Sequence, residues 1–143
     1  MKNSRDCFGC GKHNAAGLRL DFEIHGDGRL ETRFTPQPHH GGWEGVFHGG
    51  LMATLLDEAM LAHLHLHGVD AATASLEVRF RGAVALGEAL VVHAWEEGRR
   101  GKLHRMAAEA RRGGVIVAEA TAKCLRIPSA RTESNEATKA NGS

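Results

Sequence analysis

The chain has 143 residues, of which 42% are hydrophobic and 24% are charged, and its formal net charge is +1. This length and composition are typical of a globular protein with one hydrophobic core. The near-neutral charge gives no reason to expect nucleic acid or an anionic membrane as a partner, and no apolar stretch approaches the roughly 20 residues of a membrane helix.

Alternating apolar and polar residues predict two strands in the first part of the chain. From Leu18 to His25 every even-numbered residue is apolar and every odd-numbered residue is polar, which is the pattern of a strand with one buried face. The same alternation returns from Leu30 to Phe34, after a turn at Gly26-Asp27-Gly28. We therefore expect a β-hairpin.

The segment from Phe47 to Met60 is the most informative part of the sequence. It opens with His48-Gly49-Gly50 and continues as an apolar run that carries two adjacent carboxylates, Asp57 and Glu58. A helix that is apolar on nearly every side is normally buried. A carboxylate within it is costly unless something uses or satisfies the charge, so we expect the chemistry of the protein here.

Four more extended segments follow the helix, separated by short turns. They lie at residues 75–81, 88–97, 102–111 and 115–127, with glycine-rich turns at 98–101 and 113–114. Two strands, one long helix and four strands predict an α+β fold, in which a twisted antiparallel sheet or a partner subunit encloses the helix. We expect one domain over residues 1–127 and a disordered tail over residues 128–143.

Three motifs make the chain resemble the hotdog-fold thioesterases, and among them the PaaI-like group. The motifs are Cys7-Phe8-Gly9-Cys10-Gly11 with Asn14 and Gly17-Leu18, His48-Gly49-Gly50 with Leu55-Leu56-Asp57-Glu58-Ala59-Met60, and Thr73-Ala74-Ser75-Leu76. The resemblance extends from Cys7 to about Ile127. It implies a long central helix wrapped by a curved antiparallel sheet of about five to six strands.

The resemblance also implies a reaction, which is the hydrolysis of an acyl-CoA or acyl-carrier-protein thioester without a metal or a cofactor. The expected assembly is a homodimer or homotetramer with shared active sites. In such enzymes the helix acid, here Asp57, acts as nucleophile or as general base on water. Backbone N–H of Gly49 or Gly50 holds the thioester oxygen, Thr73 assists the water, and His48 lines the site.

The residues support this chemistry independently of the family. The first N–H groups of a helix are unpaired and carry partial positive charge, which suits an oxyanion, and glycine lets the backbone approach a ligand closely. Partial burial would make Asp57 a better base. Gly49 and Asp57 are eight residues apart, about 12 Å along one helix. We therefore predict that each site combines Asp57 of one subunit with Gly49 of another.

Alternatives exist for each of these roles. Glu58, about 100° further round the helix, is the other candidate for the principal acid, His48 could merely fill its turn, and a β-branched residue such as Thr73 is common in strands. The alternative functions are a non-catalytic acyl-CoA-binding or sensor protein and a hotdog hydratase or dehydratase.

Two further features are assigned to structure rather than to chemistry. Cys7-x-x-Cys10 followed by His13 has metal-like spacing, but the one remaining cysteine, Cys124, does not complete a four-ligand zinc site. We expect no metal, and the cysteines indicate free thiols in a cytoplasmic protein. Three histidines near the helix end have no nearby carboxylate that would complete a catalytic triad: His63, His65 and His67. The helix dipole favours a positively charged histidine at this end, which gives them a structural role.

The turn before the helix departs from the pattern of the family in one respect. Many relatives carry a polar side chain about six residues before the histidine, where this chain has Gly42. Trp43 and Phe47 flank the turn instead, which suggests an apolar or aromatic acyl pocket.

Overall fold

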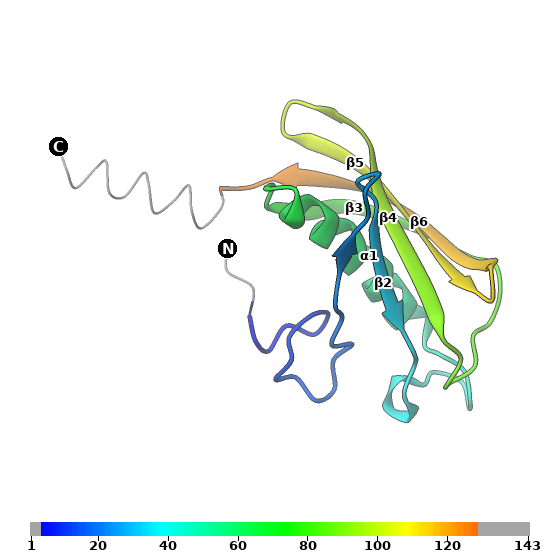
Figure 1. Ribbon diagram of the computed structural model, residues 1–143. Coiled ribbons are helices and arrows are strands. Elements are labelled where there is room, and N and C mark those ends of the chain that lie inside the picture. The colour runs from blue at the N-terminus through cyan, green and yellow to red at the C-terminus, as the bar shows by residue number, and fades with distance from the viewer. Residues whose placement is uncertain (1–3, 129–143) are drawn as a thin grey trace.

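The computed structural model describes residues 4–128, in which six strands form one antiparallel sheet in the order β1-β2-β4-β5-β6-β3 (Figure 1). The elements in chain order are β1 (Glu23–Ile24), β2 (Leu30–Phe34), the 3-10 helix η1 (Pro38–His40), α1 (Gly49–Leu66), β3 (Ala71–Phe80), β4 (Leu90–Arg100), β5 (Leu103–Arg112) and β6 (Val115–Arg126). The tail predicted from residue 128 lies, from residue 129 onward, outside the described residues. No helix within residues 4–128 is long and apolar enough to cross a membrane.

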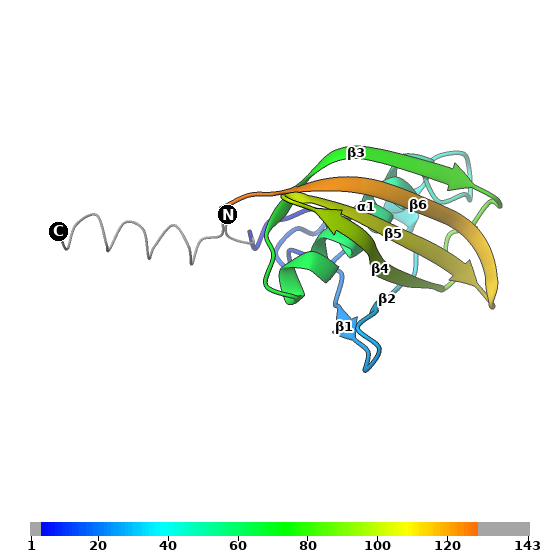
Figure 2. The same cartoon turned by 90° about the horizontal axis from the view of Figure 1, so that it is seen from above.

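Helix α1 lies against the concave face of the curved sheet, as the view from above shows (Figure 2). Two central strands present mainly small side chains in the core: Ala108, Ala110, Ala118 and Ala120. Small residues let the helix approach the sheet closely, as dense interior packing requires. This arrangement of one helix on an antiparallel sheet confirms the predicted hotdog fold.

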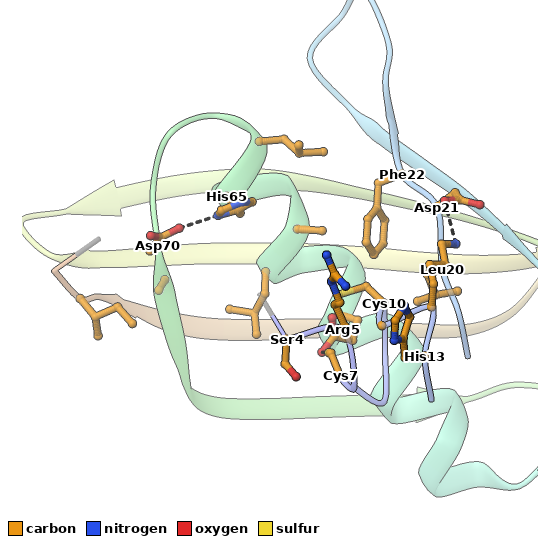
Figure 3. A pocket seen from close by; sticks show the side chains of 18 residues that line it. Ser4, Arg5, Cys7, Cys10, His13, Leu20, Asp21, Phe22, His65 and Asp70 are labelled. Carbon is orange, nitrogen blue, oxygen red and sulfur yellow. Dashed lines mark hydrogen bonds and ion pairs between the residues drawn. The ribbon is translucent and has the colours of Figure 1, made fainter. Parts of the chain in front are cut away.

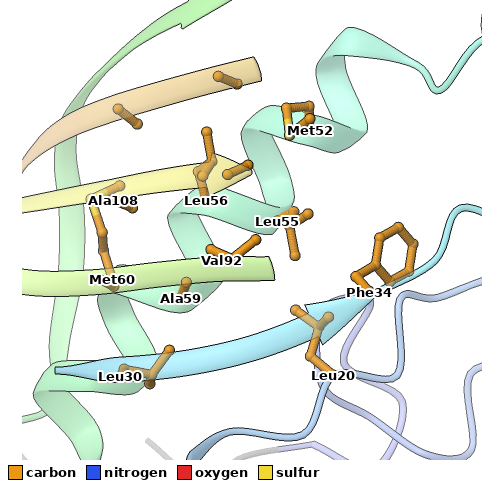
Figure 4. Packing of buried hydrophobic residues seen from close by; sticks show 14 of the residues in the cluster. Leu20, Leu30, Phe34, Met52, Leu55, Leu56, Ala59, Met60, Val92 and Ala108 are labelled. Atoms are coloured by element: carbon orange, nitrogen blue, oxygen red, sulfur yellow. The ribbon is translucent and has the colours of Figure 1, made fainter. Parts of the chain in front are cut away.

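The hydrophobic core fills the space between α1 and the sheet (Figure 4). Leu55, Leu56 and Met60 on the helix are fully buried, and Val92 and Leu30 are buried on the opposing strands. Truncating one such leucine to alanine removes about 2–5 kcal/mol of stability. The core therefore fixes the rotation of α1, and with it the direction in which Asp57 points.

The predicted first strand is much shorter than its sequence pattern. Leu18 and Leu20 are buried, as the alternation predicts. Their N–H groups, however, bond to the carbonyls of Phe8 and Gly9 in the N-terminal loop, not to a strand. The alternation predicted the burial of these two leucines correctly, but Ile24, which it also assigns to the buried face, is 37% exposed. The N-terminal loop, rather than a strand, supplies the hydrogen-bond partners of Leu18 and Leu20.

The predicted turn at residues 98–101 is also shorter in the structure. Gly98 belongs to β4, and the pairing of β4 with β5 shifts register between Glu96 and Gly98. An isolated glycine in a strand commonly marks such an irregularity, and the chain reverses only at Gly101.

Strand β3 forms one edge of the sheet. The side chains of Leu76 and Phe80, which alternate with polar residues along the strand, are 39% and 58% exposed. The apolar side of this ten-residue strand is therefore only partly covered by its own chain.

Candidate active site

Asp57 projects from the middle of α1 toward the edge strand β3. The Thr73 hydroxyl donates a hydrogen bond to Asp57 Oδ1 at 2.6 Å, and both residues are half-buried. Burial raises the pKa of Asp57, and the hydrogen bond from Thr73 partly opposes this rise. The result is a carboxylate that is more basic than a free aspartate and is held in one orientation.

A β-bulge sets the position of Thr73. Thr73 pairs with Cys124 on β6, but Ser75 pairs with Lys123, so that Ala74 is the extra residue. Bulges of this kind are frequent beside active sites because they change the direction of a side chain. Thr73 is thereby turned toward the helix.

Cys124 is a neighbour of this pair that the sequence analysis did not assign to the site. Its thiol is fully buried. Burial raises the pKa of Cys124, a hydrogen bond with Thr73 lowers it, and the nearby charge of Asp57 raises it further. A neutral thiol is a poor nucleophile, so Cys124 acts as a packing partner of Thr73. The alternation in β6 predicts its burial, but no local pattern reveals its contact with Thr73.

The start of α1 is capped by His48. Its Nδ1 accepts a hydrogen bond from the Gly50 N–H at 2.9 Å, and its carbonyl accepts bonds from Leu51 and Met52. Within residues 4–128 the Gly49 N–H has no hydrogen-bond acceptor. Of the two glycines that the sequence offers as oxyanion donors, Gly50 is thus engaged by His48, and the Gly49 N–H is free.

Two glycines make room for the His48 side chain. A Cβ on Gly50 would lie 2.9 Å from Cε1 of His48, and a Cβ on Gly42 would lie 3.2 Å from its Cα. The position at which many relatives carry a polar group is therefore packed against the capping histidine. Since Nδ1 of His48 accepts a bond, a neutral ring carries its proton on Nε2, at an exposed position.

The turn itself is hollowed. A cavity of about 510 Å³ is lined by Gly41, Gly42, Trp43, Phe47, His48 and Gly49. Trp43 is 87% exposed, whereas Phe47 is buried and packs on Phe34 with 5.5 Å between ring centroids. Phe47 is therefore mainly a core residue, and Trp43 is the aromatic group that a ligand at the turn would meet.

Glu58 is adjacent to Asp57 in the chain but faces a different environment. Its side chain lies against Gly9, where any added Cβ would collide with it, and the Cys7 thiol is 3.9 Å from its Oε1. Burial and the charge of Asp57 raise the pKa of Glu58. Burial likewise raises the pKa of the Cys10 thiol, to about 11. Glu58 therefore belongs to the N-terminal loop rather than to the group around Thr73.

A large cavity lies beside Glu58 (Figure 3). It measures about 780 Å³ and is lined by the N-terminal loop, the second half of α1 and the start of β3. Neither Asp57 nor Thr73 is among the described residues that line it. This cavity is thus separate from the acid that the sequence pattern selected.

The structure groups the predicted site residues into two separate pairs. Asp57 lies with Thr73, and His48 lies with Gly50 at the start of the same helix. Because α1 is continuous from Gly49 to Leu66, eight residues separate Gly49 from Asp57, which is about 12 Å. One chain therefore does not bring the free N–H and the acid to a common point.

The histidines at the end of α1 are largely held by structural contacts. His65 Nδ1 lies 2.5 Å from a carboxylate oxygen of Asp70 (Figure 3). The expectation that no carboxylate lies nearby was therefore wrong for His65, because Asp70 follows the helix by one short turn. His63 Nε2 contacts the Gly28 carbonyl at 3.0 Å and its ring stacks on His67.

Comparison with protein families gives one match. The model of the thioesterase superfamily matches residues 44–119, more than half of the chain. A comparison with curated proteins finds no match.

Solved structures share the fold at low sequence identity. A hypothetical thioesterase protein of Streptococcus pneumoniae TIGR4, solved with coenzyme A, has a TM-score of 0.70 and 19% identity, over 75% of this chain and 87% of that chain. A protein of Streptococcus mutans UA159 bound to acetyl-CoA has a TM-score of 0.70 and 18% identity, over 76% and 88%. A putative thioesterase of Ralstonia eutropha JMP134, described as phenylacetic acid degradation-related, has a TM-score of 0.68 and 23% identity, over 76% and 85%.

The pneumococcal protein has also been solved as two mutants. One carries an aspartate-to-alanine substitution and the other a threonine-to-alanine substitution, and the two positions are sixteen residues apart in that protein.

Proposed function

Because this chain belongs to the thioesterase superfamily, we propose that it hydrolyses an acyl-CoA thioester to a free acid and CoA. The observation that carries the proposal is the hydrogen bond from Thr73 to a half-buried Asp57 whose pKa is raised. A carboxylate at such a half-buried position lowers the stability of the fold. A catalytic role explains why it is present. The coenzyme A and acetyl-CoA bound to two structures of the same fold agree with the substrate class.

The proposed mechanism uses Asp57 as a general base. The carboxylate takes a proton from water while the water oxygen attacks the thioester carbon. The negative charge that develops on the carbonyl oxygen is stabilised by the Gly49 N–H at a helix N-terminus. Collapse of the tetrahedral intermediate breaks the C–S bond and leaves the acid. The proton held by Asp57 passes to the leaving sulfur, which releases CoA and restores the carboxylate. Alternatively, Asp57 attacks the carbon itself and water hydrolyses the resulting anhydride.

The separation of two mutated positions in the pneumococcal relative supports these roles. An aspartate and a threonine were substituted there, sixteen residues apart. Asp57 and Thr73 have the same separation, and a hydrogen bond joins them.

A two-fold dimer through β3 would complete the site. β3 begins beside Asp57, through Thr73, and ends beside Gly49, since a Cβ there would lie 3.5 Å from the Phe80 ring. Antiparallel pairing of β3 with its copy exchanges the two ends, and so brings Gly49 of the partner subunit toward Asp57. Among residues 4–128 no strand pairs with the outer edge of β3, and this edge and its exposed apolar side chains favour such pairing. A tetramer of two such dimers would keep the same two shared sites in each.

The hydratase alternative is disfavoured by the role of His48. Its Nδ1 is occupied by the Gly50 N–H, so that nitrogen is not free to accept a proton from a substrate. A sensor protein that binds acyl-CoA without turnover stays as the second candidate, and the experiment below separates it from the hydrolase.

Thiol release should be measured on a panel of aliphatic and aromatic acyl-CoAs and on an acyl-carrier protein. Aromatic substrates belong in the panel because Trp43 lines the hollow at the turn and the motifs resemble the PaaI-like group. Wild-type turnover that is lost in Asp57→Asn, with binding of a non-hydrolysable acyl-CoA analogue retained, would support the proposal. Binding without wild-type turnover on every substrate would identify a sensor instead.

A further inference from the structure

The N-terminal loop is held in one conformation by backbone hydrogen bonds rather than by a helix or strand. The Gly11 N–H bonds to the Cys7 carbonyl at 2.9 Å, and the Leu18 N–H bonds to the Phe8 carbonyl at 2.7 Å. A side chain at Gly11 would collide with the backbone of Arg5. The turn that carries Cys7 and Cys10 is therefore tight and defined.

This turn is shaped around a carboxylate that comes from the central helix. The thiols of Cys7 and Cys10 and a carboxylate oxygen of Glu58 all lie within 4.8 Å of one another. Gly9, between the two cysteines, has no room for a Cβ because the Glu58 side chain occupies that space. All three ligand residues are half-buried, and they border the cavity of about 780 Å³, which His13 also lines (Figure 3).

We propose that Cys7, Cys10 and Glu58 bind a Zn²⁺-like divalent ion. Thiolate, imidazole and carboxylate are the ligands of tetrahedral zinc sites, whereas Mg²⁺ and Ca²⁺ take oxygen ligands almost exclusively. A bound divalent cation would favour the deprotonated forms of both thiols and of the carboxylate, and would offset most of the negative charge that results. The fourth coordination position would be taken by water.

The carboxylate is the partner that the sequence did not reveal. Cys7-x-x-Cys10 lacks a second pair of cysteines, and this was the reason for expecting no metal. Glu58 lies 48 residues beyond Cys10 and reaches the thiols only through the fold. The ion would tie the N-terminal loop to α1 and fix one wall of the cavity, which is a structural role independent of thioester hydrolysis.

Co²⁺ is a suitable probe because thiolate–Co²⁺ bonds give a strong near-ultraviolet charge-transfer absorption. The full-length protein, reduced and freed of metal with a chelator, should be titrated with Co²⁺ and then with Zn²⁺. We expect saturation at about one equivalent per chain, tetrahedral visible bands, and loss of both absorptions when Zn²⁺ displaces Co²⁺. Cys7→Ser, Cys10→Ser and Glu58→Gln should each weaken Co²⁺ binding by at least about tenfold.

Cys124→Ala is the matched control, because it removes a thiol that is not part of the cluster, and it should keep the charge-transfer band. Circular dichroism of each variant reports whether it is folded, and Glu58→Gln preserves side-chain size and so tests the site without a cysteine change. Absence of the band in reduced wild type, or an unchanged Co²⁺ affinity in Cys7→Ser, Cys10→Ser or Glu58→Gln, would overturn the site. None of these outcomes bears on thioester hydrolysis.

Discussion

The Thr73 hydroxyl lies 2.6 Å from Asp57 Oδ1 and joins the edge strand β3 to the central helix. Two opposing effects act on the acid at this contact. Burial raises its pKa, and the donated hydrogen bond lowers it. The bond also fixes one carboxylate oxygen and leaves the other available to a water molecule.

Replacing Asp57 by asparagine should abolish most activity. Asparagine keeps the size of the side chain and an oxygen that accepts the Thr73 bond, but it does not take a proton from water. Loss of a general base lowers kcat by about 10²–10⁴-fold, measured by thiol release. The matched control is Glu58→Gln, whose side chain faces Cys7 and Gly9, and it should keep kcat within a few-fold. A larger loss in Glu58→Gln than in Asp57→Asn would make Glu58 the principal acid.

The same substitution should stabilise the protein at neutral pH. Because the pKa of Asp57 is raised in the folded state, its proton contributes stability that is fully present below the unfolded pKa. This contribution is lost as the pH rises through the folded pKa. An asparagine side chain does not titrate and has no such loss, so Asp57→Asn should have the higher free energy of unfolding at pH 7, and the difference should shrink in acid. Urea denaturation at several pH values measures it, and a destabilised variant at pH 7 would contradict the explanation.

The pH profile should depend on the Thr73 hydroxyl. kcat/KM should fall as the pH drops through the raised pKa of Asp57, since the protonated acid is no base. Thr73→Val removes the bond that lowers this pKa, so the acid limb should move to higher pH. The loss of a hydrogen bond to a charged group, about 1.5–3 kcal/mol, corresponds to roughly a 10–100-fold lower rate at a pH on that limb. Thr73→Ser keeps the hydroxyl and should keep the limb in place.

Periodicity in the sequence predicted the helix and most strands. It works because the core requires apolar residues at the buried positions of each element, and these positions recur with the period of the helix or strand. It failed where a segment bonds to an irregular loop, because no periodic pattern describes the path of such a loop. Leu18 is buried, yet it bonds to Phe8 in a loop rather than to a strand. The sequence likewise did not decide whether Gly49 or Gly50 has the free N–H. The answer depends on which of the two N–H groups donates a hydrogen bond to the His48 ring. The thiol partners of Glu58 could not be found, since only the tertiary fold brings them together.

Gly49→Pro should remove the N–H that we propose as the oxyanion donor, without breaking the helix. Gly49 is the first helical residue, a position where proline is favoured because its missing N–H has no helical partner. His48 has φ −63° and ψ 128°, a conformation compatible with a following proline. We expect kcat to fall by about 10²–10³-fold with little change in thermal stability. Gly49→Ala keeps the N–H and finds its nearest contact at 3.5 Å from Phe80, so it should retain most activity.

Mixed dimers test whether the active sites are shared. A chain with Asp57→Asn keeps its Gly49 N–H, and a chain with Gly49→Pro keeps its acid. If each site joins Asp57 of one subunit to Gly49 of the other, one site of a mixed dimer contains both substitutions. The other site contains neither and is intact. Heterodimers purified with two different tags should then recover about half of the wild-type kcat per dimer, although each parent is nearly inactive. Sites contained within one chain would give mixed dimers no more active than the parents, because every site would keep one lesion.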